Sequence, residues 1–174
     1  MNKGIDCLPM GKRQAGHKDY WESVCKVMEE KFLENSLIYE HFPLDSAVSN
    51  FPEFEEFHNL WSQKKQDRFL PAWEDFDFED FQPWWGSMCV VDFTFDPFDY
   101  CYRLWGTKVV EVYQVDYSQK WQSSLVEQGL APETDIIYYK PIANEAMIGW
   151  YQISLEWLDR EFITVKFLDL PLSR

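Results

Sequence analysis

The sequence predicts an α+β fold, in which helices pack on one face of an antiparallel sheet. Two stretches, 87–105 and 150–170, alternate apolar and polar residues as the strands of half-buried hairpins do. Before and between them, apolar residues recur at spacings of three and four, which favours helices. Two hairpins accompanied by helices are typical of the α+β class.

The length of 174 residues and the hydrophobic content of 46% indicate a single domain with a real core. We expect residues 1–48 to form a tail and an N-terminal helical arm, and residues 49–174 to form the folded domain. The arm is a helix from Asp19 to Asn35, a natural contact for a homodimer.

Two further helices are expected before the first hairpin. One runs from about Pro52 to Lys65, with Ser49 or Asn50 as its cap. The other is short and runs from Phe78 to Trp84. The buried stripe of the first helix is expected at Phe54, Phe57, Leu60 and Trp61, with His58 partly exposed.

The first hairpin turns at Asp96-Pro97 and is followed by a short helix from Gly106-Thr107 to Tyr113. The second hairpin pairs 150–157 with 162–170 around a turn at 158–161. No internal repeat accompanies these elements.

The formal charge of −14 argues against partners that are themselves polyanions, such as nucleic acid and anionic membranes. Acidity is concentrated in residues 29–80, which carry a net charge of −10. With no long apolar run and no signal-like N-terminus, a cytoplasmic protein is expected.

Cofactor and metal motifs are missing from the sequence. The four cysteines form no CxxC pair, and we expect Cys89 and Cys101 to be reduced strand residues, a cross-strand disulfide being the alternative. The three histidines precede the sheet, and no cysteine fits a photoactive flavin motif, so neither haem nor flavin is expected.

Three segments together resemble a bacterial family of short PAS-fold proteins. They are FLPAWEDFDFEDFQPWW, then SMCVVDFTFDPFDYCYRLWGTKVVEVYQVDYSQKW, and finally FLDLPLSR. The YRLWGT element is the most specific part, and the similarity covers about residues 54 to 173. The resemblance implies a PAS-like antiparallel sheet flanked by helices, and a role in sensing small ligands or contacting proteins.

A PAS sheet usually has one further strand after the Pro-Leu-Ser element, here Pro171-Leu172-Ser173, whereas this sequence ends at Arg174. The resemblance therefore implies either a missing strand or a different closure of the sheet. A missing strand leaves an open edge that is able to pair with another chain.

Arg103 and Asp92 fall opposite the apolar faces of their strands. We favour a cross-strand ion pair between them. The alternative is that Arg103 binds a ligand carboxylate through both of its terminal nitrogens.

An aromatic surface is expected on the concave side of the sheet. It fills the core or, where space remains, lines a pocket for a small organic ligand. The residues concerned are Phe93, Tyr100, Tyr102, Tyr151 and Trp157.

The acidic run of Asp75, Asp77, Glu79 and Asp80 lacks the glycine and glutamate that a calcium loop of the EF-hand type needs. A solvated acidic face is expected, and because acid alternates with aromatic residues it is also a candidate contact for a protein partner.

No nucleophile, phosphate-loop or zinc-protease motif argues for an enzyme. The leading hypothesis is a non-catalytic sensory or regulatory module that binds a small ligand or a protein partner. The alternatives are an acidic decoy that mimics nucleic acid and a carbohydrate-binding module, the latter suggested by nine tryptophans.

Overall fold

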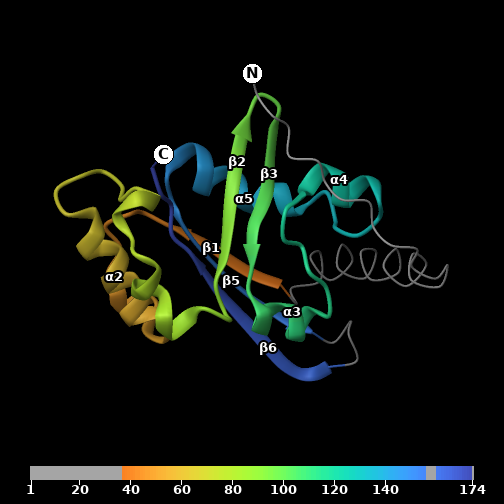
Figure 1. Ribbon diagram of the computed structural model, residues 1–174, viewed down its shortest axis with the longest axis horizontal. Helices are drawn as coiled ribbons and strands as arrows, with labels where there is room; N and C mark the ends of the chain where they lie inside the picture. Colours follow the sequence, from red (N-terminus) through yellow and green to blue (C-terminus); the bar gives the residue numbers. More distant parts are fainter. Residues whose placement is uncertain (1–36, 156–159, 174) are drawn as a thin grey trace.

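The computed structural model describes residues 37–155 and 160–173. The expected helix at 19–35 and Trp157 lie outside this range. The strands are β1 (Leu37–Phe42), β2 (Cys89–Phe95), β3 (Phe98–Trp105), β4 (Lys120–Trp121), β5 (Ile148–Leu155) and β6 (Arg160–Asp169). The α-helices are α2 (Glu55–Lys65), α3 (Thr107–Tyr113), α4 (Gln122–Glu127) and α5 (Asp135–Glu145), and the 3₁₀-helices are η1 (Val48–Asn50), η2 (Pro52–Phe54), η3 (Trp73–Asp75) and η4 (Phe78–Trp84) (Figure 1).

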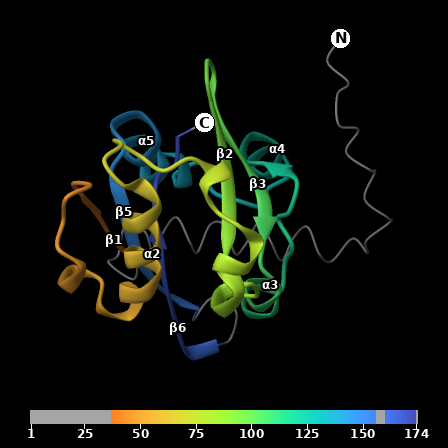
Figure 2. The same cartoon turned by 60° about the vertical axis from the view of Figure 1, so that its left-hand side comes forward.

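The described strands form two antiparallel three-stranded sheets, ordered β2-β3-β4 and β1-β5-β6. The α+β class expected from the sequence is therefore confirmed, although the strands do not join into one sheet. Figure 2 shows the β2–β3 hairpin standing beside the β1–β5–β6 sheet.

Strand β1 was not expected from the sequence. The sequence placed residues 37–42 in the N-terminal tail and arm. In the structure they pair with β5, from Leu37 opposite Ile153 to Phe42 opposite Ile148. This part of the chain therefore belongs to a sheet. The segment LIYEHF has only a broken alternation, and its pairing partner lies more than a hundred residues away, so local sequence gives a weak signal.

Both predicted hairpins are present. In the first, Phe95 pairs with Phe98 around a turn at Asp96-Pro97, whose peptide bond is cis. Asp92, and not Cys89, lies opposite Cys101, so the two cysteines are separated by roughly 10 Å along the hairpin. That separation is too great for a disulfide between them.

Helices cover both faces of the β1–β5–β6 sheet, whereas the sequence predicted helices on one face. Because strand side chains alternate between faces, odd-numbered residues such as Tyr151 and Ile153 join the core beneath α3 and α5. Even-numbered residues such as Ile148 and Leu168 pack on Phe51 beside α2. The second face needs its own cover because it too is apolar.

The largest core cluster contains buried tyrosines from β3, α3 and α5. Tyr100 is 0% exposed, and its ring centroid lies 4.6 Å from that of Tyr139 and 5.4 Å from that of Tyr102. Tyr138 follows at 5.0 Å from Tyr139. We call Tyr100, Tyr102, Tyr113, Tyr138 and Tyr139 the tyrosine cluster.

The expected helix at 52–65 is confirmed as η2 followed by α2, but two details were wrong. Neither Ser49 nor Asn50 caps it, because Phe51 and Phe54 occupy the cap positions without a side-chain hydrogen bond. His58 is only 6% exposed, since its ring lies between Phe51 and Trp61 at centroid distances of 5.6 and 6.0 Å. The aromatic neighbours thus bury a side chain that the helical pattern placed near the surface.

Gly106, in the YRLWGT element, permits a close approach of two chain segments. A Cβ at this position would lie 2.5 Å from the Gly86 carbonyl oxygen and 2.7 Å from that of Met88. The same Gly86 carbonyl accepts a hydrogen bond of 2.8 Å from the Lys108 amide in α3. A side chain at 106 would separate the start of β2 from the start of α3.

Candidate functional site

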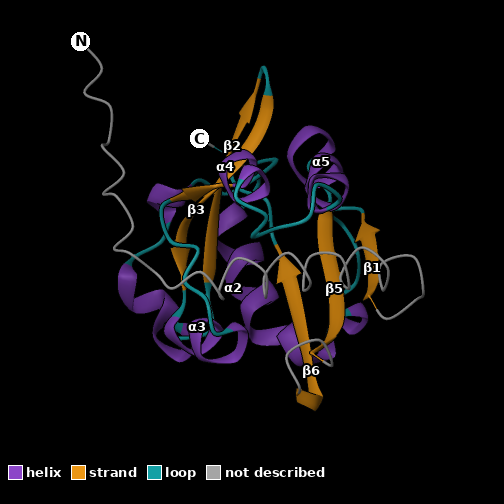
Figure 3. Ribbon diagram, turned by 90° about the vertical axis from the view of Figure 1, so that its right-hand side faces the viewer, coloured by secondary structure: helices purple, strands orange, loops and turns teal. Residues whose placement is uncertain are grey.

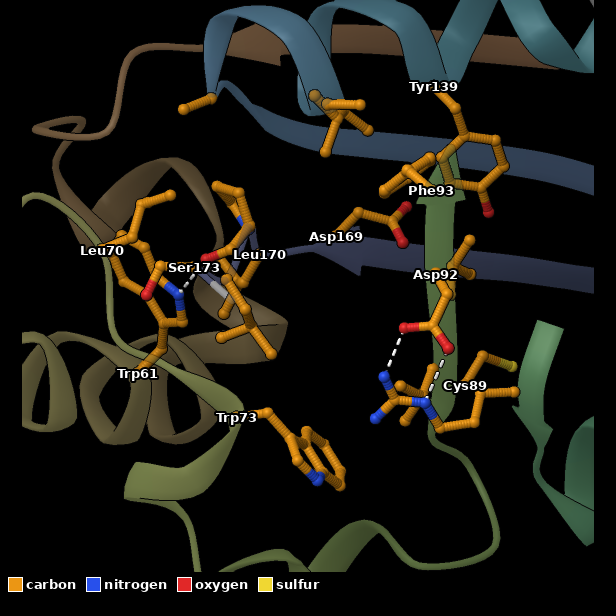
Figure 4. A pocket seen from close by; sticks show the side chains of 18 of the residues that line it. Trp61, Leu70, Trp73, Cys89, Asp92, Phe93, Tyr139, Asp169, Leu170 and Ser173 are labelled. Carbon is orange, nitrogen blue, oxygen red and sulfur yellow. Dashed lines mark hydrogen bonds and ion pairs between the residues drawn. The ribbon is translucent and has the colours of Figure 1, made fainter. Parts of the chain in front are cut away.

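A pocket of about 410 Å³ lies between the two sheets, where β2 faces β6 and the chain that follows it (Figure 4). We call it the inter-sheet slot. Its two long sides are residues 88–93 and residues 168–173. Aromatic side chains from α2, η3 and η4 close one face, and residues of α5 close the other. The former are Phe57, Trp61, Trp73, Phe81 and, directly after η3, Phe76, and the latter are Tyr139, Ile142, Ala143 and, directly after α5, Ala146.

The C-terminal side of the slot is held in place by contacts with the segment between α2 and η3. The Ser173 amide donates to the Pro71 carbonyl at 2.8 Å, and Ser173 forms an isolated parallel bridge with Ala72. The Trp61 indole donates to the Pro171 carbonyl at 2.9 Å. Leu70-Pro71 and Pro171-Leu172-Ser173, which belong to two of the segments that resemble the PAS family, therefore lie side by side at the slot.

Arg103 and Asp92 form the ion pair expected from the sequence, on the β2 side of the slot. Arg103 Nε donates to Asp92 Oδ2 at 2.7 Å, and Nη2 contacts the second carboxylate oxygen. The guanidinium also lies 5.4 Å from the centroid of the Trp73 ring. Both side chains are more than 40% exposed, so the pair is hydrated and is available to a polar group entering the slot.

Asp169 faces the slot from the end of β6. Its carboxylate accepts a hydrogen bond of 2.6 Å from the Tyr138 hydroxyl. Burial raises the pKa of Asp169 to about 6, even though the Tyr138 hydrogen bond acts in the opposite direction. Figure 4 shows Asp92 and Asp169 on the two strands that border the slot.

Cys89 and Ser173 are the slot residues whose side chains could serve as nucleophiles. Burial raises the pKa of the Cys89 thiol to about 12, so the thiol stays protonated near neutral pH. The Ser173 hydroxyl lies 3.3 Å from the Pro71 carbonyl, to which it donates. The neighbouring Asp169 carboxylate adds to the rise in the pKa of Cys89, because its negative charge opposes formation of the thiolate.

The predicted ligand residues separate into two groups. Phe93 and Arg103 line the slot. Tyr100 and Tyr102 are 0% and 5% exposed in the tyrosine cluster, and Tyr151 stacks on Phe167 at 4.7 Å in the same core. Tyr100, Tyr102 and Tyr151 therefore fill the core. Core filling was one of the two roles that the sequence predicted for the aromatic surface, the other being a ligand pocket.

The predicted acidic run also divides. Asp75 accepts a hydrogen bond from Arg68 at 2.6 Å, and Asp80 contacts Lys64 at 2.5 Å. These contacts lower the pKa of both carboxyls. Asp77 and Glu79 are exposed on either side of Phe78. Of the four acidic residues in the run, Asp77 and Glu79 therefore form the exposed acidic surface, while Asp75 and Asp80 are in ion pairs.

Sequence reasoning missed the slot because its two sides come from segments about eighty residues apart. It also missed the role of α5, since Ala143 and Ala146, the latter directly after the helix, line the slot. The sequence signal closest to the slot was the Pro171-Leu172-Ser173 element, after which a PAS sheet usually has one further strand.

Comparison of the chain with models of known protein families, with curated proteins and with solved structures finds no match. The described residues contain no group of three or more His, Cys, Asp or Glu side chains arranged to hold a metal ion. Within the same residues, every helix is too short or too polar to span a bilayer.

Proposed function

We propose that the protein is a non-catalytic, PAS-like sensory or regulatory module that binds its ligand in the inter-sheet slot. The ligand is a small organic molecule or a segment of a protein partner. The observation that carries this proposal is the slot itself, whose volume of about 410 Å³ falls within the range of ligand pockets in proteins.

The chemistry of the slot supports binding rather than catalysis. Its walls are mostly apolar and aromatic, with Asp92, Arg103 and Asp169 as the charged groups that orient a ligand. The protonated Cys89 thiol lacks the low pKa that covalent catalysis requires. A mostly apolar lining with three charged groups is suited to hold a ligand by burial and a few directed polar contacts.

The arrangement of elements supports the PAS-like part of the proposal. Two antiparallel hairpins, β2–β3 and β5–β6, are connected through α3, α4 and α5. These helices pack on the core beneath both sheets. Strand β1 and the break between β2 and β6 depart from a continuous five-stranded sheet.

Native mass spectrometry and an absorption spectrum of the freshly purified full chain test the proposal. We expect a bound molecule, or a rise in melting temperature with a compound from a small-molecule library. The control is Ala143→Leu, which places a larger side chain in the slot from the half-buried Ala143 of α5. Binding that is unaffected by this variant, while the variant folds normally, would place the ligand elsewhere and contradict the proposal.

A second candidate function is the acidic decoy for a basic protein surface. The observation in its favour is an exposed stack of Phe78 on Trp85, with centroids 4.5 Å apart, flanked by Asp77 and Glu79. It predicts binding to cationic proteins that weakens with salt and is lost in the double variant Asp77→Asn/Glu79→Gln. The carbohydrate-binding alternative stays a prediction, for which Trp73, Trp85 and Trp121 are the exposed tryptophans among the described residues.

A further inference from the structure

Asp169 is the charged side chain of the inter-sheet slot that lacks a charged partner among the described residues. It ends β6, the strand of its sheet that lies nearest to the β2–β3 hairpin (Figure 3). The other two charged side chains of the slot, Asp92 and Arg103, pair with each other. When Asp169 is ionised, the slot therefore carries one uncompensated negative charge.

One oxygen of the Asp169 carboxylate has no hydrogen-bond donor in the described part of the chain. Oδ2 accepts from the Tyr138 hydroxyl at 2.6 Å, whereas no described residue donates to Oδ1. In Figure 4, the carboxylate points across the slot towards β2. Because Asp169 lines the slot and is only half-buried, a donor that enters the slot can reach Oδ1.

The described ionisable groups beside Asp169 supply no positive charge. Burial and the Asp169 charge both raise the pKa values of four of these groups, which are therefore neutral near pH 7. They are Cys89 on β2, Tyr138 and Tyr139 on α5, and Tyr151 on β5. Buried carboxylates in proteins are normally paired, so the position beside Asp169 suits a cation that the described residues do not provide.

Aromatic rings line much of the remaining slot. They are Phe57, Trp61, Trp73, Phe76, Phe81, Phe93, Phe95 and Tyr139. The face of an aromatic ring attracts a cation, and a tryptophan face does so most strongly. Lys65 Nζ lies 5.7 Å from the centroid of the Trp61 ring, and the Arg103 guanidinium lies 5.4 Å from that of Trp73. The walls of the slot thus already attract positive groups of the chain itself.

The charges of the slot distinguish between classes of ligand. An anion would have to take Arg103 from Asp92, and it would add a like charge near Asp169. A neutral ligand would leave the Asp169 charge uncompensated. A quaternary ammonium compound has no N–H group for Oδ1, whereas a protonated primary or secondary amine has one. The ligand class that satisfies each condition is therefore a protonated amine.

We propose that the inter-sheet slot binds a small organic amine in its protonated form, with the ammonium group donating to Asp169 Oδ1 and an apolar body packed between the aromatic walls and α5. This inference rests on the proposed binding function of the slot and names the chemical class of its ligand. The apolar body is needed because most of the lining is apolar or aromatic.

The test compares three series of small molecules that carry the same benzyl, phenethyl, indolylethyl and cyclohexylmethyl bodies. The series are primary amines, alcohols and carboxylates, and each compound is titrated into the full chain by calorimetry at pH 7. We expect the amines to bind at least about 10-fold more tightly than the alcohols, and the carboxylates to bind most weakly. Equal affinity of amines and alcohols would overturn the inference.

Two variants with matched loss of one carboxylate locate the ammonium group. Asp169→Asn keeps an acceptor for Tyr138 and removes the charge, so amine affinity should fall at least about 10-fold while alcohol affinity stays the same. Glu145→Gln removes an exposed carboxylate at the end of α5, outside the slot, and should change amine affinity less than about 2-fold at physiological salt. Equal losses in both variants would reduce binding to general attraction by an acidic protein and overturn the inference.

The pH dependence of amine binding gives a readout that a structural role of Asp169 would not produce. The pKa of Asp169 is about 6, whereas the amines stay protonated between pH 5 and pH 7. Because the ammonium group binds the ionised carboxylate, amine affinity should rise about 10-fold from pH 5 to pH 7 and then level off. A flat profile over this range would overturn the inference.

His41 of β1 is a second titratable group near this helix. It hydrogen-bonds to the Tyr138 carbonyl at 2.8 Å, whereas the Tyr138 hydroxyl contacts Asp169. A pH dependence that came from His41 would persist in Asp169→Asn, and this result would contradict the inference. Calorimetry in two buffers of different ionisation enthalpy adds a check, because about half a proton should be released per bound amine at pH 6.

The variant Ala143→Leu separates failure of this inference from failure of the proposed function. Binding that the variant abolishes, but without a preference for amines, overturns the inference and leaves the proposed function intact. Amine binding that the variant leaves unchanged contradicts both. If no series binds, the inference fails, and the proposed function is left with a protein segment as the ligand.

Discussion

The tyrosine cluster and the inter-sheet slot share strand β3 and helix α5 but differ in how completely they are filled. Tyr100 and Tyr102 of β3 are 0% and 5% exposed. Across the hairpin, the β2 edge borders a pocket of about 410 Å³. Tyr139 of α5 belongs to both regions, packing on Tyr100 and lining the slot. The open space therefore lies beside the packed aromatic core and not within it.

The difference also shows why aromatic content alone is a poor guide to a ligand site. Large rings on a concave sheet face pack against helices, as in the tyrosine cluster. Space is left where backbone pairing stops, because side chains alone do not replace a strand.

The largest expected effect is on the free energy of unfolding, which should fall far more when a side chain is truncated in the tyrosine cluster than when one is truncated in the slot. Tyr100→Ala should lower the free energy of unfolding by about 3–5 kcal/mol, because a buried ring leaves a cavity. Leu172→Ala, at a slot residue that is 36% exposed, should cost less than about 1 kcal/mol. Urea unfolding of both variants measures the difference, and equal losses would show that the slot is as tightly packed as the cluster.

The next effect is the pH dependence of stability that arises from Asp169, a titrating group of the slot. The pKa of Asp169 is about 6 in the folded chain, against 3.8 for an ordinary aspartate. The folded state therefore binds the proton more tightly than the unfolded chain. The associated stability is fully present below about pH 4 and is lost as the pH rises through about 6.

Asp169→Asn removes this titration and keeps an acceptor for the Tyr138 hydroxyl. The variant should be more stable than the wild type by on the order of 2 kcal/mol at pH 7 and equal to it near pH 4. Unfolding curves across this pH range provide the measurement. A constant difference between the two proteins would indicate that Asp169 does not titrate in this window.

A smaller effect with the opposite pH dependence is expected beneath α2. Burial lowers the pKa of His58, and both ring nitrogens lack a hydrogen-bond partner. The folded chain therefore favours neutral His58, and this contribution to stability is lost as the pH falls below about 6.5. His58→Leu should add about 1–2 kcal/mol at neutral pH and more at pH 5. A loss of stability would mean that the imidazole makes a polar contact with solvent.

The smallest effect is expected at the ion pair on the rim of the slot. A double-mutant cycle with Asp92→Asn and Arg103→Gln should give a coupling energy below about 1 kcal/mol, because both side chains are more than 40% exposed. Thermal or urea unfolding of the four proteins supplies the cycle. A coupling of several kcal/mol would indicate that the pair organises the hairpin and not only its surface.

Much of the fold could be predicted from local patterns. The strands of the first hairpin and the helix at 107–113 follow from periodicity, and so does the 3₁₀-helix at 78–84, whose bounds agree with those expected. The ion pair of Asp92 and Arg103 followed from the faces of two adjacent strands. These features depend on neighbours within about fifteen residues.

The features that escaped prediction depend on distant parts of the chain. β1 becomes a strand because β5 pairs with it, and His58 is buried because Phe51 and Trp61 enclose it. The slot exists because two sheets stop short of each other, which no single segment encodes. Of the expected ligand residues that the structure describes, Phe93 and Arg103 line it, whereas Tyr100, Tyr102 and Tyr151 do not.

Gly106 connects the chain between η4 and β2 with the start of α3. The Gly86 and Met88 carbonyls, between η4 and β2, lie directly against its Cα with no side chain between them. On its other side, Gly106 leads into α3, which covers the tyrosine cluster. Because the Lys108 amide also donates to the Gly86 carbonyl, we expect a shift of the chain after η4 to move the first turn of α3 with it.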